Sequence, residues 1–321
     1  TGLDVDRWYG DSRQWTNVGG RPGTATPCVN DRARGIVSVP CVNQRVVLPG
    51  LGAYTQLDAT RGRWSASLGA RHDRVRYDIA DRIRPEQSVD RAFGQTSPRA
   101  SLRFEPRRGV SLYASVARGF EVPTSAELTA SPDTLRGFNA ALAPSSLVNY
   151  ETGVKALAGG RMLLDVAVFR TEVRGEFLSR TIVIPGVQFP RTVFENVGRS
   201  RRTGLEASAT TFLGPRADLV TSYTLSDFVL TRFTGTEVGP DGRPVARDYA
   251  GNLLPGVPRH RGALELRLRP AARLGATLWG EAQSRTYVDN GNARRGVVHA
   301  QVAQPNGPPR IVATPFAAAP G

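Results

Sequence analysis

Five tight turns at near-regular intervals constrain the fold of this 321-residue chain more than any other feature. They fall at residues 61–62, 106–109, 159–160, 214–215 and 270–272, and all are rich in Gly, Pro or Arg. Between consecutive turns lie two strand-length stretches separated by a long polar loop. Short turns on one rim and long loops on the other are typical of a β-barrel that spans an outer membrane.

Apolar and polar residues alternate on both sides of these turns. In residues 64–71 the even positions are Trp, Ala, Leu and Ala, and the odd positions are Ser, Ser, Gly and Arg. The same alternation recurs in residues 99–104, 164–169 and 264–269. Because strand side chains have a period of two, we predict that one face contacts lipid and the other an aqueous lumen. A soluble β-sandwich also alternates, but its turns need not divide into short and long classes.

Composition limits how the chain could enter a membrane. No run of about 20 apolar residues is present, so membrane residence must come from strands, in which only every second residue is apolar. The residues after Thr1 do not form a basic and apolar signal peptide. An exported protein needs such a signal, so we expect the chain to begin inside a longer precursor.

The chain is strongly basic, with 42 basic and 28 acidic residues and a net charge of +14. Lys155 is the only lysine, so the excess is almost wholly arginine. Nucleic-acid-binding domains usually cluster their basic residues on one face, whereas these arginines are scattered and often adjoin Asp or Glu. We therefore predict salt-bridged lumen walls and no nucleic-acid partner. Two origins stay open for the excess: base composition of the source genome, and attraction of anionic ligands or outer-leaflet phosphates.

The only two cysteines, Cys28 and Cys41, share one polar segment that contains Pro and Gly. An exported protein passes through an oxidising compartment, so we predict a disulfide that closes this segment, with two free thiols as the alternative. The three histidines, His72, His260 and His299, are not spaced with the cysteines as zinc ligands would be. We therefore expect no resident metal or cofactor.

Four stretches give a more specific indication. Residues 112–115 (Leu-Tyr-Ala-Ser) precede residues 118–124 (Arg-Gly-Phe-Glu-Val-Pro-Thr), and residues 142–144 (Leu-Ala-Pro) precede residues 150–155 (Tyr-Glu-Thr-Gly-Val-Lys). The motif positions in these two stretches are Gly119, Phe120, Pro123, Tyr150, Glu151 and Gly153.

The third stretch is Asn-Val-Gly at 196–198 with Arg-Thr-Gly-Leu-Glu at 202–206, and the fourth is Gly-Asn-Leu-Leu-Pro-Gly-Val-Pro at 251–258. Their motif positions are Asn196, Gly198, Gly204, Glu206, Pro255 and Pro258. In order and spacing over residues 51–292, the four stretches resemble the TonB-dependent outer-membrane receptors of the ferric siderophore type. Ser145 departs from the pattern, because that family usually has Glu there.

The resemblance implies an all-β fold, an antiparallel transmembrane β-barrel with long extracellular loops and short periplasmic turns. We expect eleven strands, about half of a 22-stranded barrel. They are predicted near residues 2–8, 51–59, 64–73, 96–104, 111–118, 149–157, 161–173, 201–212, 217–229, 260–269 and 273–283. Residues 1–292 form the partial barrel in this interpretation, and residues 293–321 an irregular tail that reflects truncated or frameshifted coding sequence. The family's N-terminal plug and its TonB-coupling box are not found in the chain.

Most motif residues are expected to serve the scaffold. Glycines allow close backbone approach, prolines end strand pairing, and Glu151, Lys155 and Glu206 point into the lumen. Ligand contacts are expected in loops near residues 79–92, 123–149, 172–195 and 227–255. Arg136, Arg180 and Arg191 in these loops are our candidates for pairing with carboxylate or catecholate oxygens of an iron chelate.

The implied function is active uptake of a ferric siderophore or similar chelate across the outer membrane of a Gram-negative bacterium, energised through the TonB complex. Iron would arrive inside its chelator, and outer-membrane lipid and lipopolysaccharide would surround the barrel. A passive porin or structural barrel is the alternative, and an outer-membrane enzyme is disfavoured because no catalytic constellation is found. Siderophore, haem, cobalamin and sugar receptors share this barrel pattern, so the ligand stays open.

Overall fold

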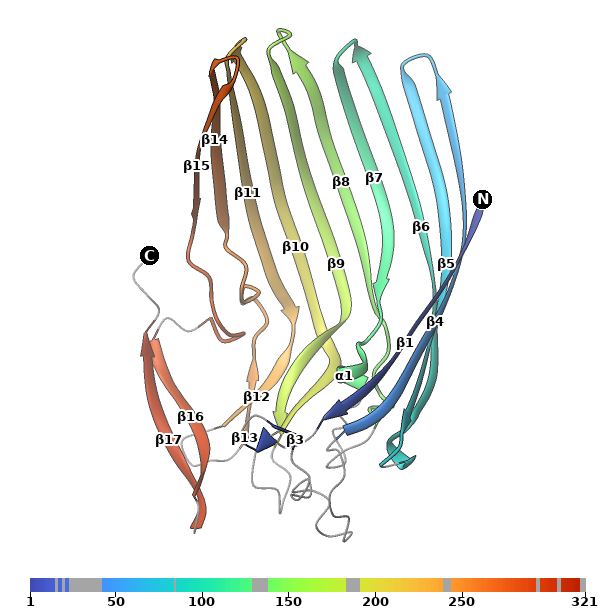
Figure 1. Ribbon diagram of the computed structural model, residues 1–321, viewed down its shortest axis with the longest axis vertical. Helices are drawn as coiled ribbons and strands as arrows, with labels where there is room; N and C mark the ends of the chain where they lie inside the picture. Colours follow the sequence, from blue (N-terminus) through green and yellow to red (C-terminus); the bar gives the residue numbers. More distant parts are fainter. Residues whose placement is uncertain are drawn as a thin grey trace. The chain divides into compact units, whose positions relative to one another are not determined.

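The computed structural model describes residues 1–14, 17–18, 21–22, 42–83, 85–128, 138–182, 191–238, 244–292, 295–304 and 307–317. Strands dominate the described part of the chain (Figure 1). The helical elements described are a 3-10 turn, η2 (Pro85–Gln87), and one helical turn, α1 (Ser125–Leu128). Neither these nor any other described helix has the length and apolar character needed to cross a membrane.

Eleven antiparallel strands are hydrogen-bonded neighbours in the order β1-β4-β5-β6-β7-β8-β9-β10-β11-β14-β15. Their bounds are β1 (Gly2–Gln14), β4 (Val42–Arg61), β5 (Trp64–Asp81), β6 (Val89–Arg107), β7 (Val110–Glu121), β8 (Ser145–Ala158), β9 (Met162–Ile182), β10 (Arg191–Gly214), β11 (Ala217–Arg232), β14 (His260–Ala271) and β15 (Leu274–Gln283). Within this sheet, each strand pairs with the long strands that come just before and just after it along the chain, as in an up-and-down sheet. These eleven strands correspond in approximate position to the eleven predicted ones. Six further strands among the described residues lie outside this sheet and were not predicted.

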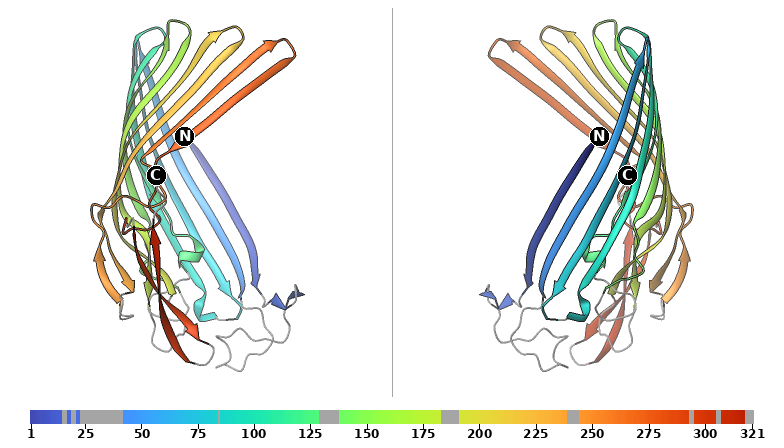
Figure 2. Two further views of the ribbon diagram at one scale, coloured as in Figure 1. Left: turned by 90° about the vertical axis from the view of Figure 1, so that its left-hand side faces the viewer. Right: turned by 90° about the vertical axis from the view of Figure 1, so that its right-hand side faces the viewer.

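All five predicted turns connect adjacent strands. The residues between the paired strands are 62–63, 108–109, 159–161, 215–216 and 272–273. Gly62 and Gly109 have φ of 60° and 79°, a left-handed conformation that side chains with a Cβ rarely adopt. Figure 2 shows these short connections at one end of the long strands that they join.

Several strands extend farther from the turns than the alternation predicts. Strand β9 was expected over residues 161–173 and reaches Ile182, and β10 was expected from residue 201 and begins at Arg191. Beyond the alternating stretch apolar and polar residues no longer alternate strictly, as at Phe177 and Leu178, so the period-two signal is lost. The backbone ladder continues nevertheless, because each residue can still pair its N–H and C=O groups with the neighbouring strand.

The chain divides into two compact units: residues 1–55, 71–96 and 122–142 in the first, and residues 56–70, 97–121 and 143–321 in the second. The first unit has an apolar core between strands and the segment that follows β7. Tyr77, Ile79 and Phe93 from β5 and β6 are buried there, together with Leu128 and Leu142 from residues 122–142.

The second unit is mainly one layer of strands. Leu112, Ala114 and Val116 lie exposed on one side of β7, which we call the apolar face, and Tyr113 lies on the opposite side, the polar face. A short hairpin, β12 (Thr234–Val238) with β13 (Pro244–Asp248), follows β11. Leu230, Phe233 and Tyr249 form a small buried cluster near it.

Residues near the two ends of the chain form two further small hairpins. One pairs β2 (Asn17–Val18) with β3 (Arg21–Pro22), and the other pairs β16 (Arg295–Gln304) with β17 (Gly307–Ala317). The expectation of an irregular tail from residue 293 is therefore wrong for the described residues of that segment. Its valines and isoleucine favour strands, and a local hairpin needs only the residues next to it in sequence. The domain boundary at residue 292 stays a prediction.

Candidate functional site

The polar face of the second unit gathers side chains from five neighbouring strands, β7 to β11. Residues that pair directly across these strands form three rows. The rows are Ser111, Lys155, Asp165, Ser208 and Ser222; Tyr113, Gly153, Ala167, Glu206 and Thr224; and Ser115, Glu151, Phe169, Gly204 and Ser226. Residues directly opposite each other in antiparallel strands share a face of the sheet. The rows therefore form one continuous polar surface.

Charged groups on this surface are connected by hydrogen bonds. Tyr113 donates its hydroxyl to Glu151 Oε1 at 2.8 Å, and Lys155 Nζ donates to Asp165 Oδ2 at 2.5 Å. The Lys155 ammonium also lies 5.9 Å from the centroid of the Tyr113 ring. These residues and Glu206 line one hollow of about 480 Å³. Sequence analysis expected Glu151, Lys155 and Glu206 on one wall, and the structure brings all three together.

Two motif glycines make room for aromatic rings on the same surface. A Cβ added to Gly153 would lie 2.6 Å from the Val166 carbonyl oxygen and 2.7 Å from the Tyr113 ring. A Cβ on Gly204 would lie 2.4 Å from the Phe169 ring. Tyr113 and Phe169 can lie flat along the sheet only because both glycines lack a side chain. Gly153 therefore leaves room for the Tyr113 ring, which lines the hollow.

Asn196 connects strand β10 to two other segments of the second unit. Its Nδ2 donates to the carbonyl oxygens of Ala143 and Gly175, at 2.7 and 2.8 Å, and its Oδ1 accepts from the Ala143 N–H at 2.7 Å. Gly175 has φ of 66°, and the β9–β10 register shifts on both sides of Gly198. The Asn-x-Gly motif thus marks a β-bulge, at which the asparagine replaces missing ladder contacts.

The stretch at residues 251–258 is held to residues 289–292, which follow β15. Asn292 accepts from the Leu253 N–H at 2.6 Å and donates to the Leu253 carbonyl at 2.8 Å, and Asn252 donates to the Asn290 carbonyl at 2.7 Å. Asn292 has a left-handed φ of 53°, which asparagine tolerates better than most residues. Pro255 and Pro258 are half-buried between these contacts and the start of β14.

Residues 122–128 and 138–142 are the described part of a stretch that sequence analysis assigned to a loop, and we call them the segment after β7; they belong to the first unit. Pro123 follows the end of β7 and is buried, and its carbonyl accepts from the Tyr77 hydroxyl at 2.6 Å. Tyr77 lies beyond the apolar stretch of β5, and burial, with the nearby Glu127, raises the pKa of its phenol above the ordinary value. The segment is therefore packed against β5.

A capping box starts the helical turn in this segment. Thr124 Oγ1 accepts from the Glu127 N–H at 3.3 Å, and Glu127 Oε2 accepts from the Thr124 N–H at 2.6 Å. The pattern Thr-x-x-Glu is readable in the sequence and could have identified this turn. Gly119 and Phe120, the motif residues just before it, lie on β7 in the second unit.

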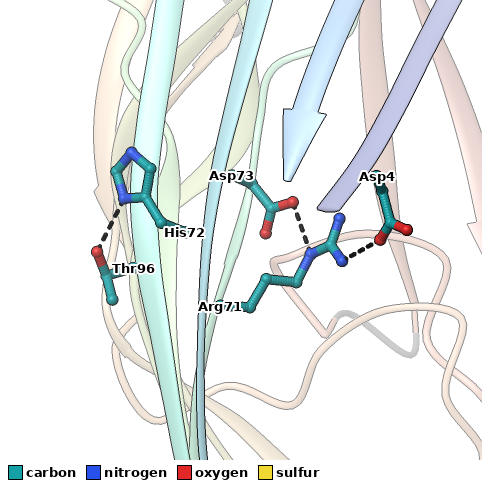
Figure 3. Close-up of polar contacts among 5 residues, drawn as sticks. All are labelled: Asp4, Arg71, His72, Asp73 and Thr96. Carbon is teal, nitrogen blue, oxygen red and sulfur yellow. Dashed lines mark hydrogen bonds and ion pairs between the residues drawn. The ribbon is translucent and has the colours of Figure 1, made fainter. Parts of the chain in front are cut away.

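The Arg71 side chain reaches from β5 across β4 to β1 in the first unit (Figure 3). It starts on β5, donates to Asp73 at 2.7 Å on the same strand, and donates to Asp4 on β1 at 2.5 Å. Gly52 of β4 lies between them, and a Cβ there would lie 2.0 Å from the Arg71 guanidinium. His72 points to the other side of β5 and contacts Thr96 at 3.0 Å.

We expect Arg71→Met to loosen the pairing of β1, because it removes both carboxylate contacts. Gly52→Ala should have the same effect by closing the path of the arginine, and the double variant should be no worse than either single one. Amide hydrogen exchange at residues 3–5 of the intact protein would rise a few-fold. Gly94→Ala is the control, because its Cβ would meet the nearest atoms at an ordinary 3.6 Å. If the double variant raised hydrogen exchange by the sum of the two single effects, both variants could not be acting through loss of the Arg71 contact with Asp4.

The three candidate ligand arginines do not form a described site. Arg136 lies outside the described residues, as do Cys28 and Cys41, so both predictions stay untested. Arg180 is paired with Val193 and Arg191 with Ile182, at the ends of β9 and β10 away from the turns. Their placement in a long open loop is therefore wrong, because the strand ladder extends that far. Their part in ligand binding stays a prediction.

A single-layer antiparallel sheet with one apolar face, one polar face and short turns on one rim is typical of a β-barrel that spans an outer membrane. The sequence pattern of the family described as "TonB dependent receptor-like, beta-barrel" matches residues 1–308. The chain belongs to this family, and its fold is part of an antiparallel transmembrane β-barrel.

Named relatives agree with this assignment. The chain is 27% identical over 245 residues to a probable TonB-dependent receptor, BfrD, of Bordetella pertussis, covering 73% of this chain and 29% of the relative. It is 25% identical over 204 residues to the ferrioxamine B receptor of Salmonella typhimurium, covering 63% and 26% respectively. The chain thus spans less than a third of the curated relatives that it matches.

The fold is also similar to solved receptor structures. The siderophore receptor PiuA of Acinetobacter baumannii superposes with a TM-score of 0.63 at 18% identity, covering 83% of this chain and 38% of the other. At this identity the similarity establishes the fold alone.

Proposed function

We propose that this chain is the barrel part of an outer-membrane receptor that imports a ferric siderophore, with energy supplied through TonB. The family match over residues 1–308 carries the proposal. Relatives named as a ferrioxamine B receptor and a probable siderophore receptor favour an iron chelate over the other ligand classes. The receptor is a transporter and not an enzyme in this proposal, and it resides in the outer membrane of a Gram-negative bacterium.

The polar face supports a lumen that is filled by protein. The side chains of this wall form two hydrogen-bonded pairs, Tyr113 with Glu151 and Lys155 with Asp165. The Lys155 and Asp165 side chains nevertheless stay 61% and 41% exposed. A wall of this kind suits contacts with a plug of protein and water, and such plugs close the large barrels of outer-membrane transporters. Iron would travel as cargo within its chelator, so no metal ligands on the wall are required.

A test of the proposal is uptake of radiolabelled ferric siderophores by cells that carry the full-length receptor as their only siderophore receptor. We expect growth under iron limitation on at least one ferric siderophore, and loss of uptake when TonB is removed. Uptake that continues without TonB would show a passive porin instead. Absence of uptake for ferric siderophores, with uptake of haem, cobalamin or a sugar, would reject the proposed ligand class.

A variant of the polar surface separates binding from transport in the same cells. Lys155→Gln removes the central ammonium of the hollow, so we expect slower uptake with unchanged binding of the chelate at the cell surface. Arg261→Gln is the matched control, because Arg261 forms its own ion pair with Glu281 at 2.6 Å on β14 and β15 and does not line the hollow. Equal slowing by both variants would argue against a specific role for the hollow.

A further inference from the structure

Residues 251–258 are held from two sides within the second unit. On one side they pair with the end of β11, where the Leu254 N–H donates to the Phe228 carbonyl at 2.9 Å. On the other side they contact the turn at residues 289–292, which we call the asparagine turn. The Leu253 N–H donates to the side-chain oxygen of the last residue of this turn, at 2.6 Å. One side can therefore be released while the other stays paired.

The asparagine turn has the sequence Asp-Asn-Gly-Asn and is closed by a weak hydrogen bond. The Asn292 N–H donates to the Asp289 carbonyl at 3.4 Å, which is longer than such bonds usually are. The Asn290 backbone carbonyl accepts from Asn252 Nδ2 at 2.7 Å. Among the described residues, no hydrogen bond involves the Asn290 carboxamide or the Gly291 N–H. The two groups are neighbours along the chain, and both are free to react.

Asn290 differs in this respect from the other asparagines whose side chains the structure describes. Five of these have carboxamides that take part in hydrogen bonds: Asn139, Asn149, Asn196, Asn252 and Asn292. The sixth, Asn43, has a carboxamide oxygen without a partner, but this oxygen is buried. None of the six is followed by a glycine, whereas Asn290 is.

A free carboxamide can react with the backbone nitrogen of the next residue. Hydroxide removes the proton from the Gly291 nitrogen, which then bonds to Asn290 Cγ. The bond from Cγ to Nδ2 breaks, and Nδ2 leaves as ammonia after taking a proton from water, which restores the hydroxide. Water then opens the cyclic imide at either carbonyl and leaves aspartate or isoaspartate. Glycine favours this attack because no Cβ hinders its nitrogen and its backbone rotates freely.

We propose that Asn290 is a site of spontaneous deamidation in the folded protein, and that its isoaspartate product releases residues 251–258 from the asparagine turn. In isoaspartate the main chain runs through Cβ and Cγ, so the turn becomes longer. The carbonyl that accepts from Asn252 becomes part of a carboxylate outside the main chain, and Asn292 moves away from Leu253. The inference concerns the covalent chemistry of this turn alone, so it is independent of the proposed transport function.

The first test ages the intact protein in mildly alkaline buffer and follows its peptides by mass spectrometry. We expect Asn290 to gain the mass difference between an amide and an acid, while Asn196 and Asn252 stay unchanged. The rate should rise about tenfold for each unit of pH, because the attacking nitrogen must first lose its proton. Asn306 also precedes a glycine but lies outside the described residues, so its peptide is measured separately.

Two variants test the chemistry and its structural setting. Gly291→Ala is the matched control, because Gly291 does not have a left-handed φ that would exclude alanine. Its Cβ hinders the attack, so most of the deamidated product should be lost. Asn252→Ala removes the donor to the Asn290 carbonyl, so the turn should open more often. We expect Asn290 to react about fivefold faster in this variant.

The second test measures the release by amide hydrogen exchange at single residues of the aged protein. The Leu253 N–H should exchange faster, because its acceptor on Asn292 moves away. The Leu254 N–H should keep its protection, because it donates to the Phe228 carbonyl. Aged Gly291→Ala should show neither change.

Three results would overturn the proposal. The first is an Asn290 that stays intact while a free peptide of sequence Asp-Asn-Gly-Asn reacts fully under the same conditions. The second is equal deamidation of Gly291→Ala and the wild type. The third is a deamidated protein in which exchange at Leu253 is unchanged, or rises equally at Leu253 and Leu254.

Discussion

Gly204→Ala should lower the free energy of unfolding of the full-length receptor, whereas Gly262→Ala should leave it unchanged or raise it. A Cβ at position 204 would lie 2.4 Å from the Phe169 ring and 2.8 Å from the Leu225 carbonyl oxygen. The ring can rotate, but the carbonyl is held in the ladder of β11. Overpacking of this kind costs about 1–3 kcal/mol.

Gly262 is a matched control for this effect because it is also a strand glycine on an interior strand. A Cβ there would meet only the Ser222 carbonyl oxygen, at an ordinary 3.7 Å. Replacing a tolerant glycine by alanine stabilises proteins by about 0.4–1 kcal/mol, because the unfolded chain loses freedom. Urea unfolding in detergent, followed by the shift in electrophoretic migration of unboiled samples, measures both variants. Equal midpoints for the two would contradict the packing described for Gly204.

Asn196→Ala is expected to destabilise the receptor and to free the chain around Ala143 and Gly175. The side chain makes three hydrogen bonds to backbone groups, at 2.7, 2.7 and 2.8 Å. Each such bond contributes about 1 kcal/mol net, and a partner left without a bond costs more, so a loss of roughly 3 kcal/mol is expected. The same urea series measures this loss, and limited proteolysis should show new cleavage near residues 143 and 175.

Two further variants sharpen the prediction for Asn196. Asn196→Asp keeps the oxygen that accepts from Ala143 but loses both donated bonds, so its effect should be large as well. Asn290→Ala removes an asparagine whose side chain makes no described hydrogen bond, and it should change the midpoint little. If Asn196→Ala behaves like Asn290→Ala, the asparagine does not anchor these segments.

The strands and turns could be predicted from sequence because their signals are local. A glycine in a two-residue turn and a period-two pattern beside it involve only adjacent residues, as at Gly62 and Gly109. The resemblance to a receptor family rested on motif residues whose scaffold roles are also local. Such features need no knowledge of which distant strand lies alongside.

The features that could not be predicted depend on register or on burial by distant segments. Arg71 reaches Asp4 only because Gly52 leaves a path between them, and that requires the pairing of β1 with β4. Leu128 and Leu142 lie in a stretch that reads as a polar loop, yet both are buried. A count of arginines also cannot show that five of them share one face of the sheet, because they come from β7, β9 and β10 and meet only in register: Arg118, Arg170, Arg174, Arg199 and Arg201.

The short stretch of apolar residues on the apolar face of β7 also bears on which bilayers suit this protein. Outward apolar residues on β7 run only from Val110 to Val116 before Arg118 follows on the same side. A hydrophobic belt this narrow matches a thin hydrocarbon slab, and the bacterial outer membrane is thinner than average. In a bilayer with longer acyl chains, the lipids around these strands would have to compress to match the belt. Because this compression costs free energy, the protein would be favoured in a membrane whose hydrocarbon thickness matches its belt.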